Sequence, residues 1–293
     1  MLIAAGLITN ASAASPREPA AAPATPQTVH FIVADGRTEL VAYLFEPGGT
    51  GRHPAVVMLH GRSGPYSANV NAGCTQIAPG QESPCNATTL SRRHAMWGAY
   101  WAQHGYAALL VDSFGPRGRA HGYGRHTHDD ADRVAVNERT VRPLDAEAAL
   151  AWLAARPDVR ADRVMLQGWS NGASTALNAM YRQAQNPAPA GAPRFRAALV
   201  LYPGCGPRAL ISQRYAADAN VWAFLGSDDE EVSPTTCASV LGQARAGPVD
   251  VTLYPGATHD FDDPGSARQA VAANRAAKDD AMARAAALFD ALP

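Results

Sequence analysis

A serine between two glycines, in the segment 168–172 (GWSNG), has the spacing of a catalytic nucleophile. The segment follows the apolar run 164–166 and precedes the helix-like run 173–177, so a strand passes into a helix at this point. A serine on such a sharp turn is raised above the edge of the sheet, where its hydroxyl can attack a carbonyl carbon. The two glycines leave room for the strained turn and for close packing of the helix. The pattern therefore predicts Ser170 as a nucleophile for acyl transfer.

A nucleophilic serine needs a histidine base, and the histidine needs a carboxylate that orients it. Asp228 and Asp229 follow the apolar run 220–225, and His259 follows the run 249–254. Taken alone, the aspartates could be an acidic turn before a helix, and the histidine could be an exposed loop residue. The order of serine, carboxylate and histidine after successive strands instead favours a catalytic triad.

An acyl-transfer site also needs two backbone N–H groups that hold the negatively charged oxygen. One is the N–H of Asn171, directly after the nucleophile, and the other comes from a loop after an earlier strand. The apolar run 54–59 ends in His60-Gly61-Arg62, where a small residue lets the N–H of Arg62 point inward. We expect His60 to be a structural histidine beneath this loop.

Apolar strands alternate with helical stretches along the chain, which predicts a mostly parallel sheet with helices on both faces. Because the carboxyl ends of parallel strands share one edge, the predicted catalytic residues should meet there. The expected strands are 29–33, 39–45, 55–59, 106–111, 163–167, 197–202, 221–225 and 249–254. The expected helices cover about 91–104 and 130–155, the stretch after Ser170, and about 266–292.

The composition bounds the setting of this site. A chain of 293 residues is long enough for one domain with a large buried sheet. Its 25 basic and 26 acidic residues nearly balance, and no basic stripe or charge run suggests nucleic acid or a membrane surface as a partner.

A second polar cluster could hold a divalent metal, since imidazole and carboxylate groups are common ligands. A polar loop with acidic residues at a helix N-terminus, favoured by the helix dipole, is the preferred interpretation. The chain also lacks a C-x-x-C pair. We therefore expect no metal and no cofactor. The residues of this cluster are His121, His126, His128, Asp129, Asp130 and Asp132.

The first 14 residues form a short apolar run that ends in small residues and contains the A-x-A pattern of a cleavage site at 11–13. The run is too short to span a bilayer. Residues 15–27 are rich in proline and alanine and are typical of a disordered leader. We expect a signal peptide at 1–14, a leader at 15–27 and a catalytic domain at 28–293.

Four cysteines make an even set, and disulfides persist in oxidising compartments. Four cysteines allow three connectivities, and buried reduced thiols are the alternative. The pairing of neighbours along the chain, Cys74 with Cys85 and Cys205 with Cys237, is the local choice. The cysteines favour a periplasmic or secreted bacterial protein.

Several of these segments together resemble the dienelactone hydrolase family of α/β-hydrolases, in its secreted branch with a serine nucleophile. They span most of the chain after about residue 28. The matching segments are 59–61 (LHG), 105–118 (GYAALLVDSFGPRG), 168–172 (GWSNG), 202–205 (YPGC), the turn 226–237 and 254–261 (YPGATHDF).

The resemblance implies an α/β-hydrolase fold, with Ser170 as nucleophile, Asp229 as acid and His259 as base. It also implies that Arg62 and Asn171 supply the backbone donors for the oxyanion. The sequence departs from the family at two points. Dienelactone hydrolases proper use a cysteine nucleophile. In addition, the proline of the acidic turn lies five residues beyond Asp229 instead of four, which keeps Asp228 as a competing acid.

We therefore interpret the chain as a serine hydrolase that cleaves small-molecule carboxylic esters or lactones through an acyl-enzyme, as a monomer or weak homodimer. The alternatives are a peptidase of the prolyl oligopeptidase type, although the sequence offers no propeller domain, and a non-catalytic binding protein on the same fold.

The pocket should be shallow, because the segment 203–219 is too short for a cap domain. We expect its rim to consist of the long segment 62–90, stapled by the first cysteine pair, and the segment 113–128. The Arg62 side chain is either a solvent-facing rim residue or a partner for a substrate carboxylate. The candidate walls are Tyr66, Phe114, Tyr123 and Trp169.

Overall fold

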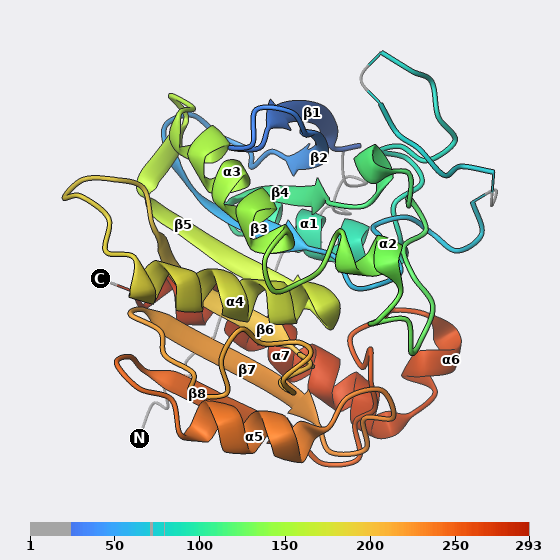
Figure 1. Ribbon diagram of the computed structural model, residues 1–293, viewed down its shortest axis with the longest axis vertical. Helices are drawn as coiled ribbons and strands as arrows, with labels where there is room; N and C mark the ends of the chain where they lie inside the picture. Colours follow the sequence, from blue (N-terminus) through green and yellow to red (C-terminus); the bar gives the residue numbers. More distant parts are fainter. Residues whose placement is uncertain (1–24, 71–72, 79, 293) are drawn as a thin grey trace, which may run out of the picture.

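The computed structural model describes residues 25–70, 73–78 and 80–292 (Figure 1). The predicted signal peptide and most of the predicted leader lie outside these residues. All eight described strands form one sheet in the order β1-β2-β4-β3-β5-β6-β7-β8. β2 pairs antiparallel with β1 and with β4, and the other neighbours are parallel. The strands are β1 (Gln27–Ile32), β2 (Glu39–Phe45), β3 (His53–Leu59), β4 (Ala107–Asp112), β5 (Val159–Trp169), β6 (Phe195–Leu201), β7 (Asn220–Gly226) and β8 (Val249–Tyr254).

Helices cover both faces of the sheet, as predicted. α3, α4 and α5 lie on the face toward the viewer in Figure 1, and α1 and α7 lie behind it. The helices are α1 (Arg92–Gln103), the 3-10 turn η1 (Gly115–Arg117), α2 (Ala131–Val134), α3 (Arg142–Ala154), α4 (Asn171–Gln185), α5 (Pro234–Gly242), α6 (Ser266–Gln269) and α7 (Ala272–Asp290).

The central strands are almost continuously apolar because both sides of the sheet are buried. Successive side chains point to opposite faces. Val57 and Leu109 therefore contribute to the core beneath α3 and α4, whereas Met58 and Leu110 contribute to the core beneath α1 and α7. The two cores make the sheet a rigid support for the loops at its carboxyl edge.

The predicted helix over 130–155 is wrong in its middle, where the chain forms the separate helices α2 and α3. The Asn137 side-chain oxygen accepts the backbone N–H groups of Arg139 and Thr140, both at 2.8 Å. Such local bonds compete with helical hydrogen bonds. Pro143 then favours a new helix start, because proline suits the first turn of a helix.

The predicted C-terminal helix over 266–292 is also broken, because Val271 has an extended conformation between α6 and α7. The break brings the buried Asn274 side chain onto the loop before His259. Its amide oxygen accepts the N–H of Thr258 at 2.8 Å, and its amide nitrogen donates to the Arg268 carbonyl at 3.1 Å. The interruption between α6 and α7 thus supports the histidine loop.

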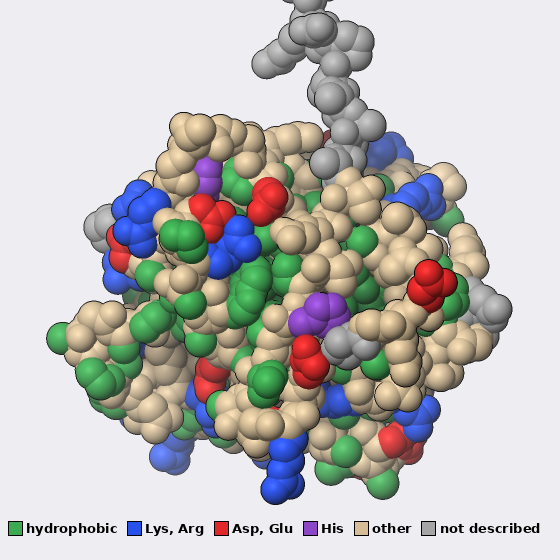
Figure 2. Space-filling model, turned by 90° about the horizontal axis from the view of Figure 1, so that it is seen from above, with side chains coloured by type: hydrophobic (Ala, Val, Ile, Leu, Met, Phe, Trp, Pro, Cys, Tyr) green, Lys and Arg blue, Asp and Glu red, His purple; other side chains and the backbone are tan. Residues whose placement is uncertain are grey.

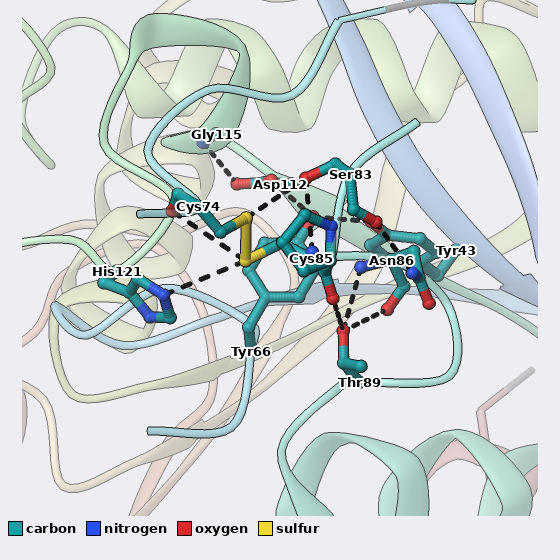
Figure 3. The surroundings of a disulfide bond; sticks show 11 residues. Tyr43, Tyr66, Cys74, Ser83, Cys85, Asn86, Thr89, Asp112, Gly115 and His121 are labelled. Carbon is teal, nitrogen blue, oxygen red and sulfur yellow. Dashed lines mark hydrogen bonds between the residues drawn. A yellow bond between two sulfur atoms is a disulfide. The ribbon is translucent and has the colours of Figure 1, made fainter. Parts of the chain in front are cut away.

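Two disulfides join the cysteines in the predicted pairs. Cys205 and Cys237 link the loop after β6 to α5, with their Cα atoms 4.9 Å apart. Cys74 and Cys85, with Cα atoms 6.0 Å apart, staple the long loop after β3. Figure 3 shows this second bridge beside His121, whose ring nitrogen lies 3.8 Å from the Cys85 sulfur.

The described surface carries both signs of charge. On the face shown in Figure 2, basic and acidic side chains are dispersed among polar and apolar ones rather than collected in one basic stripe. In residues 25–70, 73–78 and 80–292, no helix has both the length and the apolar character that spanning a membrane requires.

Removing the Cys205–Cys237 bridge should destabilise the protein more than removing Cys74–Cys85. The two bridges span 32 and 11 residues. The chain-entropy account, which is model-dependent, assigns about 3 to 4 kcal/mol to the longer loop and about 3 kcal/mol to the shorter one. Urea unfolding of the two double-serine variants without reductant measures this difference. Equal stability of the two variants, or a larger loss in the variant without Cys74–Cys85, would contradict the prediction.

Candidate active site

Ser170 occupies a strained turn between β5 and α4. Its backbone angles are φ 51° and ψ −114°, a combination that residues other than glycine rarely adopt. The flanking glycines are a steric requirement of this turn. A Cβ atom on Gly172 would come 1.9 Å from the Leu59 carbonyl oxygen, and one on Gly168 would come 2.3 Å from that of Gly172. The G-x-S-x-G spacing thus lets α4 begin directly against the end of β3.

His259 and Asp229 meet Ser170 at the carboxyl edge of the sheet. The histidine follows β8 and the aspartate follows β7, so three different strand ends contribute to the cluster. His259 Nε2 lies 3.0 Å from Ser170 Oγ, and His259 Nδ1 lies 2.8 Å from an Asp229 carboxylate oxygen. A continuous path of hydrogen bonds therefore connects the hydroxyl to the carboxylate.

Asp229, and not Asp228, is the partner of the histidine. The Asp229 carboxylate is buried, and its other oxygen accepts the N–H groups of Glu231 and Val232 at 2.8 and 2.9 Å. Asp228 is exposed and accepts a hydrogen bond from the Ser227 hydroxyl at 2.7 Å. The extra residue before Pro234 does not move the carboxylate away from His259.

The surroundings of His259 favour its protonated form. Burial lowers the pKa of the imidazole, but the hydrogen bond to Asp229 and the charges of Asp260, Asp229 and Glu231 outweigh this effect and raise the pKa above its ordinary value. One Glu231 oxygen lies 3.9 Å from His259 Nε2. Contact with Arg62 lowers the pKa of Glu231 in spite of its partial burial, so this carboxylate stays ionised at neutral pH.

The loop after β3 and the start of α4 border the same space. A Cβ atom on Gly61 would be 3.7 Å from Ser170 Cβ, so the peptide before Arg62 lies against Ser170. Asn171 is the first residue of α4, and its backbone N–H has no acceptor within the helix. His60 is buried beneath the loop, where its Nε2 accepts the N–H of Ser113 at 3.2 Å. Burial lowers the pKa of His60, which suits a neutral structural residue.

A buried carboxylate supports the site from below. Asp262 accepts the indole N–H groups of Trp97 and Trp169, both at 2.8 Å, and the hydroxyl of Tyr202. Trp169 directly precedes Ser170, and the centre of the Tyr202 ring lies 4.7 Å from the centre of the His259 ring. Sequence reasoning missed Asp262, although its position three residues after the histidine was a usable signal.

The four aromatic residues predicted as pocket walls do not line the pocket. All four side chains are buried, and each contacts a different set of residues inside the protein. The Trp169 indole points down to Asp262, and the Tyr66 hydroxyl donates to Asp112 at 2.8 Å (Figure 3). Phe114 packs edge-on against His60 and Tyr123, and the Tyr123 hydroxyl donates to the Asp132 carbonyl at 3.0 Å.

The cavity above Ser170 has a volume of about 320 Å³ and is lined by both charged and apolar groups. Among its described residues, the disulfide-stapled segment contributes only Arg62 to the cavity, so the predicted rim is wrong on that side. The short segment after β6, judged too small for a cap, forms a wall instead, together with the segment 125–138 and the acidic turn. The lining residues are Arg62, Arg125, His126, His128, Arg133, Glu138, Ser170, Asn171, Ser174, Gly204, Cys205, Gly206, Arg208, Ala209, Glu230, Glu231, Val232, Ser233 and Thr236.

Arg62 is neither a free rim residue nor an open site for a substrate carboxylate. Its guanidinium donates to both Glu231 oxygens, at 3.2 and 3.1 Å, and to the Tyr123 carbonyl at 3.1 Å. Arg125 also contacts Glu231 at 2.5 Å. The glutamate beside the histidine is therefore held by two arginines that close one side of the pocket.

The second polar cluster of the sequence is divided among ion pairs. Asp132 pairs with Arg119, Asp129 pairs with Arg208 at 3.1 Å, and His128 lies 3.5 Å from Glu138. Within the described part of the chain, no three histidine, cysteine, aspartate or glutamate side chains converge as a metal site requires.

The model of the dienelactone hydrolase family matches residues 92–292 of this chain. Among curated proteins, no sequence matches significantly. A dienelactone hydrolase-like promiscuous phosphotriesterase from metagenomic libraries is similar in structure, with a TM-score of 0.61 and 19% identity over 92% of this chain and 98% of that one.

Two further solved structures have the same fold. A thermophilic esterase from the planctomycete Thermogutta terrifontis, with propionate bound, has a TM-score of 0.58 and 15% identity over 88% of this chain and 94% of that one. Dipeptidyl peptidase 4 from Porphyromonas gingivalis has a TM-score of 0.55 and 21% identity over 86% of this chain but only 35% of that one. At these identities the likenesses establish the α/β-hydrolase fold.

Replacing Asp229 by asparagine should reduce esterase kcat by about 10³-fold or more, because the amide favours the wrong imidazole tautomer. Asp228→Asn is the matched control and should stay within about twofold of the wild type, since Asp228 is exposed and does not contact His259. Steady-state kinetics, with melting temperatures of both variants, measure the difference. Equal, mild losses would mean that another group orients His259.

Activity should fall as the pH drops through an apparent pKa above that of free imidazole, about 6.5. The base must be neutral, so the raised pKa of His259 moves the loss of activity to higher pH. Because Glu231 helps to raise this pKa, Glu231→Gln should shift the acid limb of kcat/KM to lower pH. Asp228→Asn again serves as the control. An unchanged limb in Glu231→Gln, or a flat wild-type profile from about pH 5 to 8, would contradict this account.

Proposed function

Because this chain belongs to the dienelactone hydrolase family, we propose that it hydrolyses carboxylic esters or lactones through an acyl-enzyme on Ser170. The protein is a carboxylesterase-like hydrolase, and we propose here its catalytic residues and its class of substrate. The path of hydrogen bonds from Ser170 Oγ through His259 to Asp229 is the observation that carries it.

In the first half-reaction, Ser170 Oγ attacks the ester carbonyl carbon while its proton passes to His259 Nε2. Asp229 keeps the other ring nitrogen protonated and stabilises the imidazolium that forms. The N–H groups of Arg62 and Asn171 stabilise the negative oxygen of the tetrahedral intermediate. As that intermediate collapses, the imidazolium gives its proton to the departing alkoxide, and the acyl group stays on Ser170.

In the second half-reaction, water replaces the alcohol. His259 takes a proton from the water as its oxygen attacks the acyl carbon, and the same two N–H groups hold the second oxyanion. Collapse breaks the bond to Ser170 Oγ, which recovers a proton from His259. The acid product leaves, and the enzyme returns to its starting state.

The small cavity supports short substrates. A volume of about 320 Å³ is at the low end for small-molecule sites. Four arginines and three glutamates line the cavity, so a long alkyl chain would leave these charges without water. The Thermogutta neighbour was solved with the three-carbon acid propionate. We therefore favour short acyl groups.

The disulfides support a periplasmic or secreted location, because such bonds persist in oxidising compartments. On this proposal residues 1–14 are a signal peptide, 15–27 a leader and 28–293 the catalytic domain.

A peptidase of the prolyl oligopeptidase type uses the same kind of chemistry and is the alternative activity. A binding protein on the same fold would not turn over either kind of substrate.

Assays on p-nitrophenyl esters from C2 to C16, with matched anilides, test the proposal. The wild type should show its highest kcat/KM at C2 to C4 and little anilide cleavage. Ser170→Ala should lose about 10³-fold or more in kcat with an unchanged melting temperature. Near-wild-type activity in Ser170→Ala would end the serine mechanism, and a maximum at C10 or longer would refute the small pocket. Preferred anilide cleavage would favour the peptidase.

A further inference from the structure

A buried arginine connects the two backbone segments that border the nucleophile. Arg142, the first residue of α3, is fully buried. Its Nη2 donates to the His60 carbonyl at 2.8 Å, and its Nη1 donates to the side-chain oxygen of Asn171. One guanidinium therefore bridges the loop after β3 and the first residue of α4.

Placing a cation here is costly, so its presence requires an explanation. Burial removes the guanidinium from water, and a positive charge at a helix N-terminus opposes the helix dipole. Arg142 Nε is buried without a hydrogen-bond partner. No carboxylate of the described residues forms an ion pair with Arg142. Burial lowers its pKa to about 10, so the group is still charged at neutral pH.

The neighbouring Arg117 shows the contrast. It donates to both oxygens of Asp145, each at 2.8 Å, and so uses the acidic residue in the first turn of α3. Arg142 instead faces neutral acceptors and the ring of Phe114, whose centre lies 4.8 Å from the guanidinium carbon. The hydrogen bonds of Arg142 are therefore directed at the edge of the active site, while the carboxylates of Asp145, Glu138 and Asp112 stabilise its charge from a distance.

We propose that Arg142 is a positioning residue that aligns the oxyanion-binding N–H groups of Arg62 and Asn171. The inference rests on the function proposed above. Asn171 carries one of these N–H groups, and its side chain is bound to Arg142. The second belongs to the peptide between Gly61 and Arg62, next to the His60 carbonyl that Arg142 fixes. The buried charge also favours the negative oxygen, because electrostatic interactions are strong where water is excluded.

Such a role has a characteristic kinetic signature. The two N–H groups matter most when the carbonyl oxygen becomes negative, so their misalignment should lower kcat and leave KM nearly unchanged. Complete removal of one oxyanion donor costs about 10²- to 10³-fold in kcat in other hydrolases. Loss of a group that only aligns the donors should cost less, about 10- to 100-fold.

The test compares Arg142→Met with Arg117→Met, a matched removal of a neighbouring cation that touches neither segment. On p-nitrophenyl acetate, Arg142→Met should lose about 10- to 100-fold in kcat with KM within about threefold. Arg117→Met should keep its kcat within about threefold. Ser170 Oγ adds to the carbonyl carbon of a trifluoromethyl ketone, the serine proton moves to His259, and the adduct carries a stable oxyanion. Its inhibition constant should rise in Arg142→Met by about the factor that kcat/KM falls.

A wild-type kcat in Arg142→Met would overturn the inference, and so would a loss confined to KM or an unchanged inhibition constant. If Arg142→Met does not fold, Arg142→Lys and Asn171→Ala replace it. Each should lower kcat, and the double variant should lose less than the product of the two single losses, because both act through one contact. Independent losses would refute the positioning role. Labelling of wild-type Ser170 by a fluorophosphonate separates this result from failure of the proposed function, in which the wild type itself would not be labelled.

Discussion

α4 begins in direct contact with the end of β3, and this close approach sets the geometry of the candidate site. Gly172 lies against the Leu59 carbonyl with no space for a Cβ atom, and Ser170 consequently adopts a left-handed conformation. This strain is tolerated because two buried cores hold the sheet and α4 in place. The same approach brings the start of α4 beside the loop after β3, so the serine and both segments of the proposed oxyanion site share one small space.

Buried polar groups fix the orientation of this space in a way that apolar packing alone would not. Asp262 gathers the N–H groups of Trp97 and Trp169, and Arg142 joins His60 to Asn171. A buried charge is favourable only when hydrogen bonds replace water, so each of these groups restricts the side chains around it. The geometry around Ser170 therefore depends on buried acidic and basic side chains that do not line the pocket.

Charged side chains around the pocket determine the basicity of His259. Glu231 lies 3.9 Å from His259 Nε2 and is held by Arg62 and Arg125. The glutamate increases the basicity of the histidine, while the arginines keep that carboxylate ionised and in place. The Cys205–Cys237 bridge joins the wall formed by the segment after β6 to α5 and limits the movement of that segment. The small size and the charged lining of this cavity are the basis on which we propose short substrates.

Sequence patterns alone predicted the eight strands, the helices on both faces of the sheet and the order of Ser170, an acidic turn and His259, but they did not predict the breaks within 130–155 and 266–292. Apolar periodicity and glycine spacing are local properties, so they could be recognised without coordinates. Contacts between distant segments decided the rest. The carboxylate that reaches the histidine depends on the path of the turn after β7, which placed Asp229 there. The aromatic residues expected to line the pocket, such as Trp169 and Phe114, pack against buried residues instead. The proposed role of Arg142 depends on contacts among the loop after β3, the start of α3 and the start of α4. Sequence patterns record which residues are buried or turn the chain, whereas the partners of a buried polar group are fixed only when the chain packs.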